Sequence, residues 1–110
     1  MRGIDVLNRK PDVEVTFSFL GVRLTPSANG YRPHHDIAED VSICGSHHYY
    51  GDEIAPVLGT IDGTITFLMP EAYGAVFHIG QRVNIMEGSR IVGYAIINRV
   101  LNPMLEPKDK

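Results

Sequence analysis

Apolar and polar residues alternate with a period of two along much of this chain. From Val13 to Phe19 every odd position is apolar, while Glu, Thr and Ser occupy the even ones. This is the pattern of a β-strand with one buried face. Ile37, Val41 and Ile43 repeat it more weakly, because Glu39 interrupts the apolar face. Both stretches therefore predict strands.

A third alternating set runs from Ile61 to Met69 and is interrupted by Gly63, which predicts a β-bulge. The last set predicts a hairpin with arms at 81–87 and 90–101. Gly88-Ser89 forms its tip, since glycine supplies the positive φ of a type II′ turn. Both faces of the second arm are largely apolar, so we expect a central strand covered on both sides. The patterns predict an all-β fold, a small barrel or a sandwich.

Composition limits the classes of protein that fit. The 110 residues fit one domain. Ten basic against thirteen acidic residues give a net charge of −3, which disfavours sequence-independent nucleic-acid binding. A single cysteine, Cys44, excludes an internal disulfide and fits a reducing compartment. With no signal-like start and no apolar run of membrane-spanning length, we expect a cytoplasmic protein without membrane association.

Two glycine-containing phrases are the most specific motifs. The first is Gly30-Tyr31-Arg32-Pro33, and the second runs from Glu87-Gly88-Ser89-Arg90 to Gly93. In this order, together with Lys10-Pro11 and Leu68-Met69-Pro70, they resemble the C-terminal β-barrel domain (domain 3) of bacterial elongation factor Tu. The resemblance covers roughly residues 10–101. It implies a small closed antiparallel β-barrel of about six strands at 10–102. The composition of the two ends, with two prolines and four charged residues in the last eight, predicts an extension at 1–9 and a flexible tail at 103–110.

The resemblance also implies a function. In the family this domain packs on a GTPase domain, helps to hold the T-arm of aminoacyl-tRNA and is gripped by the nucleotide-exchange factor. It therefore implies a non-catalytic binding module with protein or RNA contacts and, first of all, a translation partner. A purely structural role in closing the barrel is the alternative. The residues that match the family's contact surfaces are Gly30, Tyr31, Arg32, Glu87, Gly88, Ser89 and Arg90.

Nucleotide and RNA binding are expected to be absent or weak. No phosphate-binding loop of the Gly-x-x-x-x-Gly-Lys-Ser/Thr type occurs, so we expect no GTP or GDP binding and no cofactor. Asn29 stands where the family usually has a basic residue before Gly-Tyr-Arg-Pro. With the negative net charge, this predicts weak or no tRNA binding by the isolated chain.

Four of the five histidines and Cys44 lie within fifteen residues, from His34 to His48. The second half of this stretch belongs to a polar insertion at 42–58, which the resemblance follows poorly. Imidazole and thiolate are ligands that Zn²⁺ prefers. Adjacent strand residues point to opposite faces, so only one of His34 and His35 could join a site. We favour solvated histidines without a bound metal, and no enzyme activity. The metal candidates are His34, His35, Cys44, His47 and His48.

The run His47-His48-Tyr49-Tyr50 instead predicts a recognition loop, because such side chains are favoured at interfaces. We expect the chain to dock on a partner or to form a homodimer through Tyr31, Tyr49, Tyr50 and Tyr73, with Arg32 or Arg90 as charged anchors. Two alternatives remain open. One is a repurposed barrel acting as a decoy, an immunity-type protein or a regulator, and the other is a metal-dependent enzyme.

Overall fold

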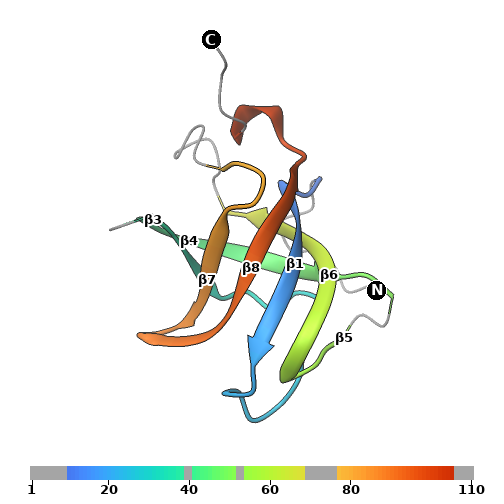
Figure 1. Ribbon diagram of the computed structural model, residues 1–110, viewed down its shortest axis with the longest axis vertical. Helices are drawn as coiled ribbons and strands as arrows, with labels where there is room; N and C mark the ends of the chain where they lie inside the picture. The colour runs from blue at the N-terminus through green and yellow to red at the C-terminus, as the bar shows by residue number, and fades with distance from the viewer. Residues whose placement is uncertain (1–9, 39–40, 52–53, 69–76, 106–110) are drawn as a thin grey trace.

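Six antiparallel strands close into a barrel in the order β1-β6-β4-β3-β7-β8 (Figure 1). This computed structural model describes residues 10–38, 41–51, 54–68 and 77–105. The predicted all-β fold with a closed barrel is confirmed. The described residues contain no helix with the length and hydropathy needed to cross a membrane. The barrel strands are β1 (Val13–Leu20), β3 (His34–Ala38), β4 (Val41–Tyr49), β6 (Leu58–Phe67), β7 (Arg82–Glu87) and β8 (Arg90–Val100).

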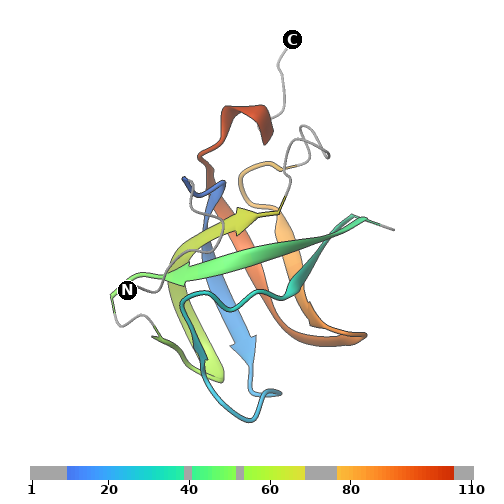
Figure 2. The same ribbon diagram turned by 180° about the vertical axis from the view of Figure 1, so that it is seen from behind.

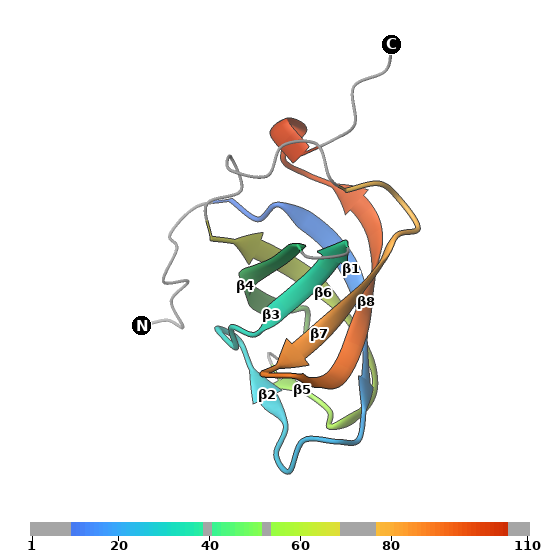
Figure 3. The same ribbon diagram turned by 90° about the vertical axis from the view of Figure 1, so that its left-hand side faces the viewer.

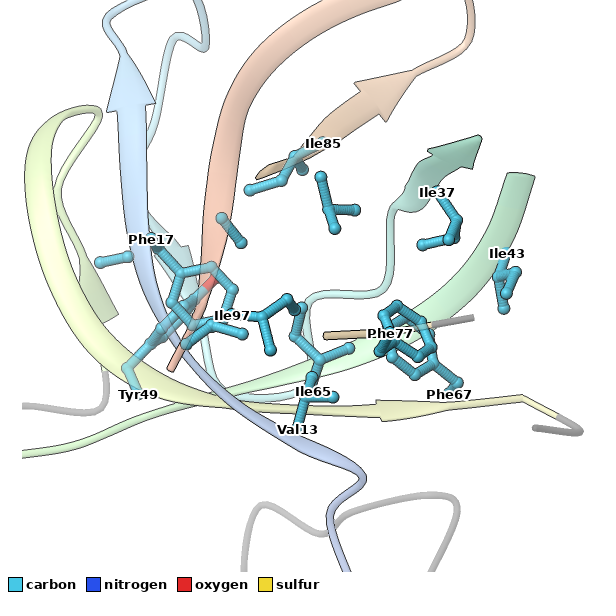
Figure 4. Packing of buried hydrophobic residues seen from close by; sticks show 14 of the residues in the cluster. Val13, Phe17, Ile37, Ile43, Tyr49, Ile65, Phe67, Phe77, Ile85 and Ile97 are labelled. Atoms are coloured by element: carbon cyan, nitrogen blue, oxygen red, sulfur yellow. The ribbon is translucent and has the colours of Figure 1, made fainter. Parts of the chain in front are cut away.

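Strand β1 shows how the alternation builds the core. Its odd residues, from Val13 to Phe19, are buried inside the barrel, and its even residues face outwards. β1 pairs with β6 on one side and β8 on the other, so its inward side chains reach the centre. Figure 4 shows Phe17, Tyr49 and Ile97 meeting at one level, with Phe67 and Phe77 packed at another.

Two details of the predicted strands differ from the structure. Ile37 and Ile43 lie on neighbouring antiparallel strands, β3 and β4, and not on one strand. Gly63 sits in regular register opposite Val15, so it marks no bulge. A Cβ there would overlap the carbonyl oxygen of His48, which makes Gly63 a site of close strand approach.

The β7–β8 hairpin follows the prediction at its tip. Glu87 pairs with Arg90, and Gly88 has a φ of +63°. A β-bulge between Ile85 and Met86 shifts the register of the two arms. The expected full cover on both faces of β8 is wrong, because Tyr94 and Ile96, which alternate with the buried Ala95 and Ile97, are only half-buried. The barrel is one layer of strands, and only its inner face is packed.

One end of the barrel is closed by residues beyond the last strand. Pro103–Leu105 form a short 3-10 helix, and Leu105 is fully buried. The ring of Phe77, 4.9 Å from that of Phe67, lies against the same end, and its N–H donates to the Leu105 carbonyl. The barrel unit therefore extends past residue 102, and a flexible tail is wrong for 103–105. Residues 106–110 and the predicted extension at 1–9 lie outside the described part.

The expected insertion at 42–58 is mostly part of the barrel. Its first half is β4, which pairs with β3 and β6. The short β5 (Ile54–Ala55) pairs with β2 (Ser27–Ala28) in a separate two-stranded sheet. Figure 3 shows this small sheet at the lower end of the barrel. In Figure 2 the segment between β1 and β3 runs over the outside of the barrel and then alongside β4. That segment carries the first glycine phrase to the site.

Candidate functional site

The two glycine phrases meet in space at Glu87. The Tyr31 hydroxyl donates to Oε2 of Glu87 across a separation of 56 residues. Arg23 Nε donates to the same oxygen at 2.7 Å, and the guanidinium of Arg90 donates to Oε1 at 3.2 Å. Arg90, which the resemblance assigns to a partner surface, thus binds a carboxylate of its own chain. Arg23 is a member that the sequence analysis missed.

Hydrogen bonds set the ionisation of this cluster. The pKa of Glu87 lies below its ordinary value, first because the Tyr31 hydroxyl donates to the carboxylate and then because both arginines do. The pKa of Tyr31 is raised, mainly by burial and then by the neighbouring carboxylate. Both effects keep Tyr31 as a donor and Glu87 as an acceptor at neutral pH. The cluster is therefore a fixed, charge-assisted contact.

Arg23 holds its own loop against this cluster. Its guanidinium also donates to the Thr25 carbonyl at 2.8 Å and lies 4.4 Å from the centre of the Tyr31 ring. The next residue, Leu24, is 98% exposed. Leu24 is thus an exposed apolar side chain on a loop that Arg23 holds by its bonds to Glu87 and to the Thr25 carbonyl. The other predicted contact residues at this end, Arg32 and Ser89, are exposed, and Gly88 forms the hairpin tip.

A second polar cluster lies inside the barrel. The Nε2 atoms of His35 on β3 and His47 on β4 are 2.8 Å apart. Nδ1 of His35 lies 3.0 Å from the Ile43 carbonyl oxygen. Nδ1 of His47 lies 2.9 Å from the Tyr49 hydroxyl, which is 2.8 Å from the hydroxyl of Ser27. These contacts form one continuous chain of hydrogen bonds.

The chain assigns the tautomers of both imidazoles. A carbonyl oxygen can only accept, so Nδ1 of His35 carries a proton and, in the neutral ring, its Nε2 accepts. Nε2 of His47 must then donate, which leaves its Nδ1 to accept from the Tyr49 hydroxyl. Ser27 in turn donates to Tyr49. Every bond therefore points from Ser27 towards the Ile43 carbonyl.

Burial keeps both imidazoles neutral. It lowers the pKa of His35 to about 4, and it lowers the pKa of His47, helped by the nearby His35 and Arg23. The expectation of solvated histidines is therefore wrong for these two residues. The predicted recognition loop is also wrong, because His47 and Tyr49 lie on β4 and are 1% exposed.

The described residues hold no group of three or more His, Cys, Asp or Glu side chains that could bind a metal ion. The alternation of the strands explains this. His35 and His47 point inwards and use their ring nitrogens on each other and on neighbouring protein groups. His34 and His48 are exposed on the outer face, and Cys44 is half-buried, with its thiol 3.8 Å from the Arg32 carbonyl.

A groove of about 340 Å³ lies on the outside of β4 and β6. Three of the residues predicted to contact a partner, Gly30, His48 and Tyr50, line this groove. The Tyr50 hydroxyl donates to Glu14 at 2.8 Å. Ser46, Thr64 and Thr66 also line this groove. The groove and the Glu87 cluster are joined by Gly30 and Tyr31, which are adjacent in sequence.

The predicted aromatic docking patch is only partly present. Tyr50 is 43% exposed, but Tyr49 belongs to the core, and Tyr73 lies outside the described residues. Exposed aliphatic side chains, and not Tyr49, form an apolar surface at the barrel end that carries the hairpin tip. Leu20 and Leu58 are exposed there and pair across β1 and β6. The exposed apolar residues toward this end are Leu20, Leu24, Ile54, Leu58 and Ile91.

No protein-family model matches the chain, and a search of curated proteins finds no sequence relative.

Proposed function

We propose that this protein is a non-catalytic binding module that acts through protein contacts, with a component of the translation machinery as its first candidate partner. The observation that carries the proposal is the contact of Tyr31 with Glu87. It joins the two phrases by which the chain resembles domain 3 of elongation factor Tu. Three residues that the resemblance assigns to partner surfaces, Tyr31, Glu87 and Arg90, thus lie in one cluster at the hairpin tip.

The composition of this surface favours a protein partner. Tyrosine and arginine are enriched among the residues that dominate interface energies. Leu24 projects from a loop that Arg23 already holds in place, so little conformational entropy is lost when a partner covers it. The exposed Arg90 adjoins it through Glu87. Such a fixed apolar anchor beside a charged rim is typical of a docking site.

RNA is the less favoured partner. Salt-dependent phosphate contacts dominate RNA affinity and require several free cations. Arg23 and Arg90 are both paired with Glu87, and the chain has a net charge of −3. We expect no tRNA binding tighter than about micromolar at physiological salt. The single cysteine supports action in the cytoplasm.

Affinity capture with matched variants tests the proposal. Wild-type protein is used as bait in lysate of its own cells, with and without nuclease, beside Leu24→Ser, Arg90→Ala and Ile79→Ser. Ile79 is also exposed but precedes β7, at the opposite barrel end from the hairpin tip, so Ile79→Ser is the control. We expect a nuclease-resistant protein that wild type and Ile79→Ser retain equally and that the other two variants lose at least tenfold.

The identity of that protein separates the hypotheses. A ribosomal protein or translation factor supports the translation assignment. A partner outside translation supports the repurposed barrel, acting as a decoy, an immunity-type protein or a regulator. Self-association lost in Leu24→Ser, measured by analytical ultracentrifugation, identifies the homodimer. Capture that Leu24→Ser and Arg90→Ala leave unchanged contradicts this surface as the binding site.

A further inference from the structure

The backbone of His47 holds the first glycine phrase in place. The Gly30 N–H donates to the His47 carbonyl at 2.9 Å, and the His47 N–H donates to the Tyr31 carbonyl at 2.8 Å. Nearby, the Tyr49 N–H donates to Oδ1 of Asn29 at 2.7 Å. The segment 29–33 thus lies along β4 where β3 no longer pairs with it. Any displacement of His47 acts directly on this segment.

The side chain of His47 contacts the same segment. Its ring lies edge-on to the Tyr31 ring, with centroids 5.3 Å apart, and packs 4.3 Å from the Phe17 ring. Tyr31 in turn binds Glu87. A continuous set of contacts therefore runs from the buried histidine pair to the surface cluster at the hairpin tip.

The histidine pair can hold one added proton but not two. A proton on His35 Nε2 reverses the chain: His47 then accepts at Nε2 and donates from Nδ1 to Tyr49, and Tyr49 donates to Ser27. Every hydrogen bond within the chain survives this reversal. A second proton places two N–H groups face to face across 2.8 Å, with no acceptor between them. The doubly protonated pair must separate.

We propose that the His35–His47 pair is a proton-sensitive latch that holds the segment 29–33 closed against β4 and releases it when both imidazoles are protonated. The contact that yields is the one between His47 and the segment 29–33. His47 is paired with Ile65 of β6 on one side, but on its other side its backbone bonds go to Gly30 and Tyr31, outside the barrel strands. His35 is instead held on both sides, by β4 and β7. The latch is a property of the barrel alone, and only its effect on partner binding rests on the proposed function.

The groups around His35 and His47 do not stabilise positive charge on the two imidazoles, so protonation of both favours release of the segment 29–33. The charged or titratable groups that act on it are His34 on β3, Arg23 after β1, and the hydroxyl groups of Tyr31 and Tyr49. From β1 and β6 the pair meets aromatic rings, those of Phe17, Phe19 and Phe67, and the nearest inward residue of β7, Ile85, is apolar. Within the described residues no carboxylate contacts either imidazole. The low pKa of His35, about 4, places release in acid.

Hydrogen exchange and imidazole NMR on the whole chain test the latch. At pH 7 we expect a proton on Nδ1 of His35 and on Nε2 of His47. Between pH 6.5 and 4, we expect the protection factor of the Gly30 amide to fall at least tenfold and to stay below that of the Phe17 amide in β1 at every pH, which shows that the segment 29–33 opens without global unfolding. Protection factors are used because the intrinsic exchange rate itself changes with pH.

Two variants complete the test. His35→Gln removes one titrating group but keeps a polar side chain, and it should make the acid-induced loss of protection at Gly30 several-fold smaller than in wild type. His48→Gln, an exposed neighbour, should behave like wild type. Opposite tautomers at pH 7, equal protection factors of Gly30 and Phe17 at every pH, or a loss of protection at Gly30 that is as large in His35→Gln as in wild type would each overturn the proposal. If His35→Gln fails to fold, the tautomers and the wild-type exchange profile still decide it.

Discussion

His35 and His47 face each other through their Nε2 atoms at 2.8 Å, inside a barrel interior where neither side chain is more than 1% exposed. Such a contact requires one ring to donate and the other to accept. The Ile43 carbonyl and the Tyr49 hydroxyl complete the partners of both rings. A fully satisfied polar chain in an apolar core specifies one arrangement of the surrounding strands, because any slip leaves buried groups unpaired. The pair therefore couples ionisation to the stability of the barrel.

The free energy of unfolding should fall as the pH drops below about 6.5. The pKa of His35 is lowered to about 4 in the folded state, so the unfolded chain binds more protons between these two values. Stability is then full above pH 6.5 and falls until about pH 4, by about 3 kcal/mol for one such group. Urea denaturation across this range, in wild type and His35→Gln, measures the difference that His35 causes. Curves of equal slope against pH would contradict the prediction.

Truncation of Phe17 should be among the most damaging changes. Its ring is fully buried and packs on those of His47 and Tyr49. We expect Phe17→Ala to lower the free energy of unfolding by about 3–5 kcal/mol, from lost burial and a residual cavity. Leu24→Ala is the matched surface change and should stay within about 0.5 kcal/mol of wild type. Chemical denaturation of both variants at pH 7 tests this; similar losses would refute the assigned core.

Two glycine substitutions should separate crowding from backbone strain. In Gly63→Ala the new methyl group meets the His48 backbone, which cannot move without breaking the β4–β6 ladder. We expect a loss of about 3 kcal/mol or more. In Gly88→Ala the added group has open space, and only the φ of +63° is unfavourable, so we expect about 1–2 kcal/mol. The reverse order in thermal or urea unfolding would show that the register of β4 and β6 is wrong.

Removal of one hydroxyl should change the ionisation of Glu87. The Tyr31 hydroxyl is the largest cause of the lowered pKa of this carboxyl, so Tyr31→Phe should raise that pKa towards its ordinary value. The lost hydrogen bond should also reduce stability by about 1 kcal/mol. Tyr94→Phe is the control, since its ring stacks on Arg82 at 3.9 Å and makes no contact with Glu87. An NMR titration of the Glu87 carboxyl that is identical in wild type and Tyr31→Phe would exclude the contact.

The secondary structure was largely predictable because alternation fixes which side chains share a face. The odd residues of β1 and the hairpin tip at Gly88 were found in this way. The predictions of an insertion at 42–58 and of a recognition loop from His47 to Tyr50 fail for residues 42–49, which form most of β4. They depend on the poor match of this stretch to the resemblance and on its polar residues. In the barrel, the inward position of Gly45 is needed, since a Cβ would press against Ile65 and Phe67. The sequence did carry a signal for the buried imidazole of His47, because this residue continues the inward-facing set of Ile43 and Tyr49 at every second position.

The alternating strands, their inward faces and the hairpin tip can be found from local pattern, because each depends on neighbours a few residues away. Which inward faces meet follows only from closure of the barrel. Ser27 reaches Tyr49, His35 reaches His47 and Arg23 reaches Glu87, all through barrel closure in the order β1-β6-β4-β3-β7-β8. Strand order and register are set by the packing of the whole core, to which every strand contributes at once. A local pattern records which face is buried but not what lies opposite, so the site emerged only with the closed barrel.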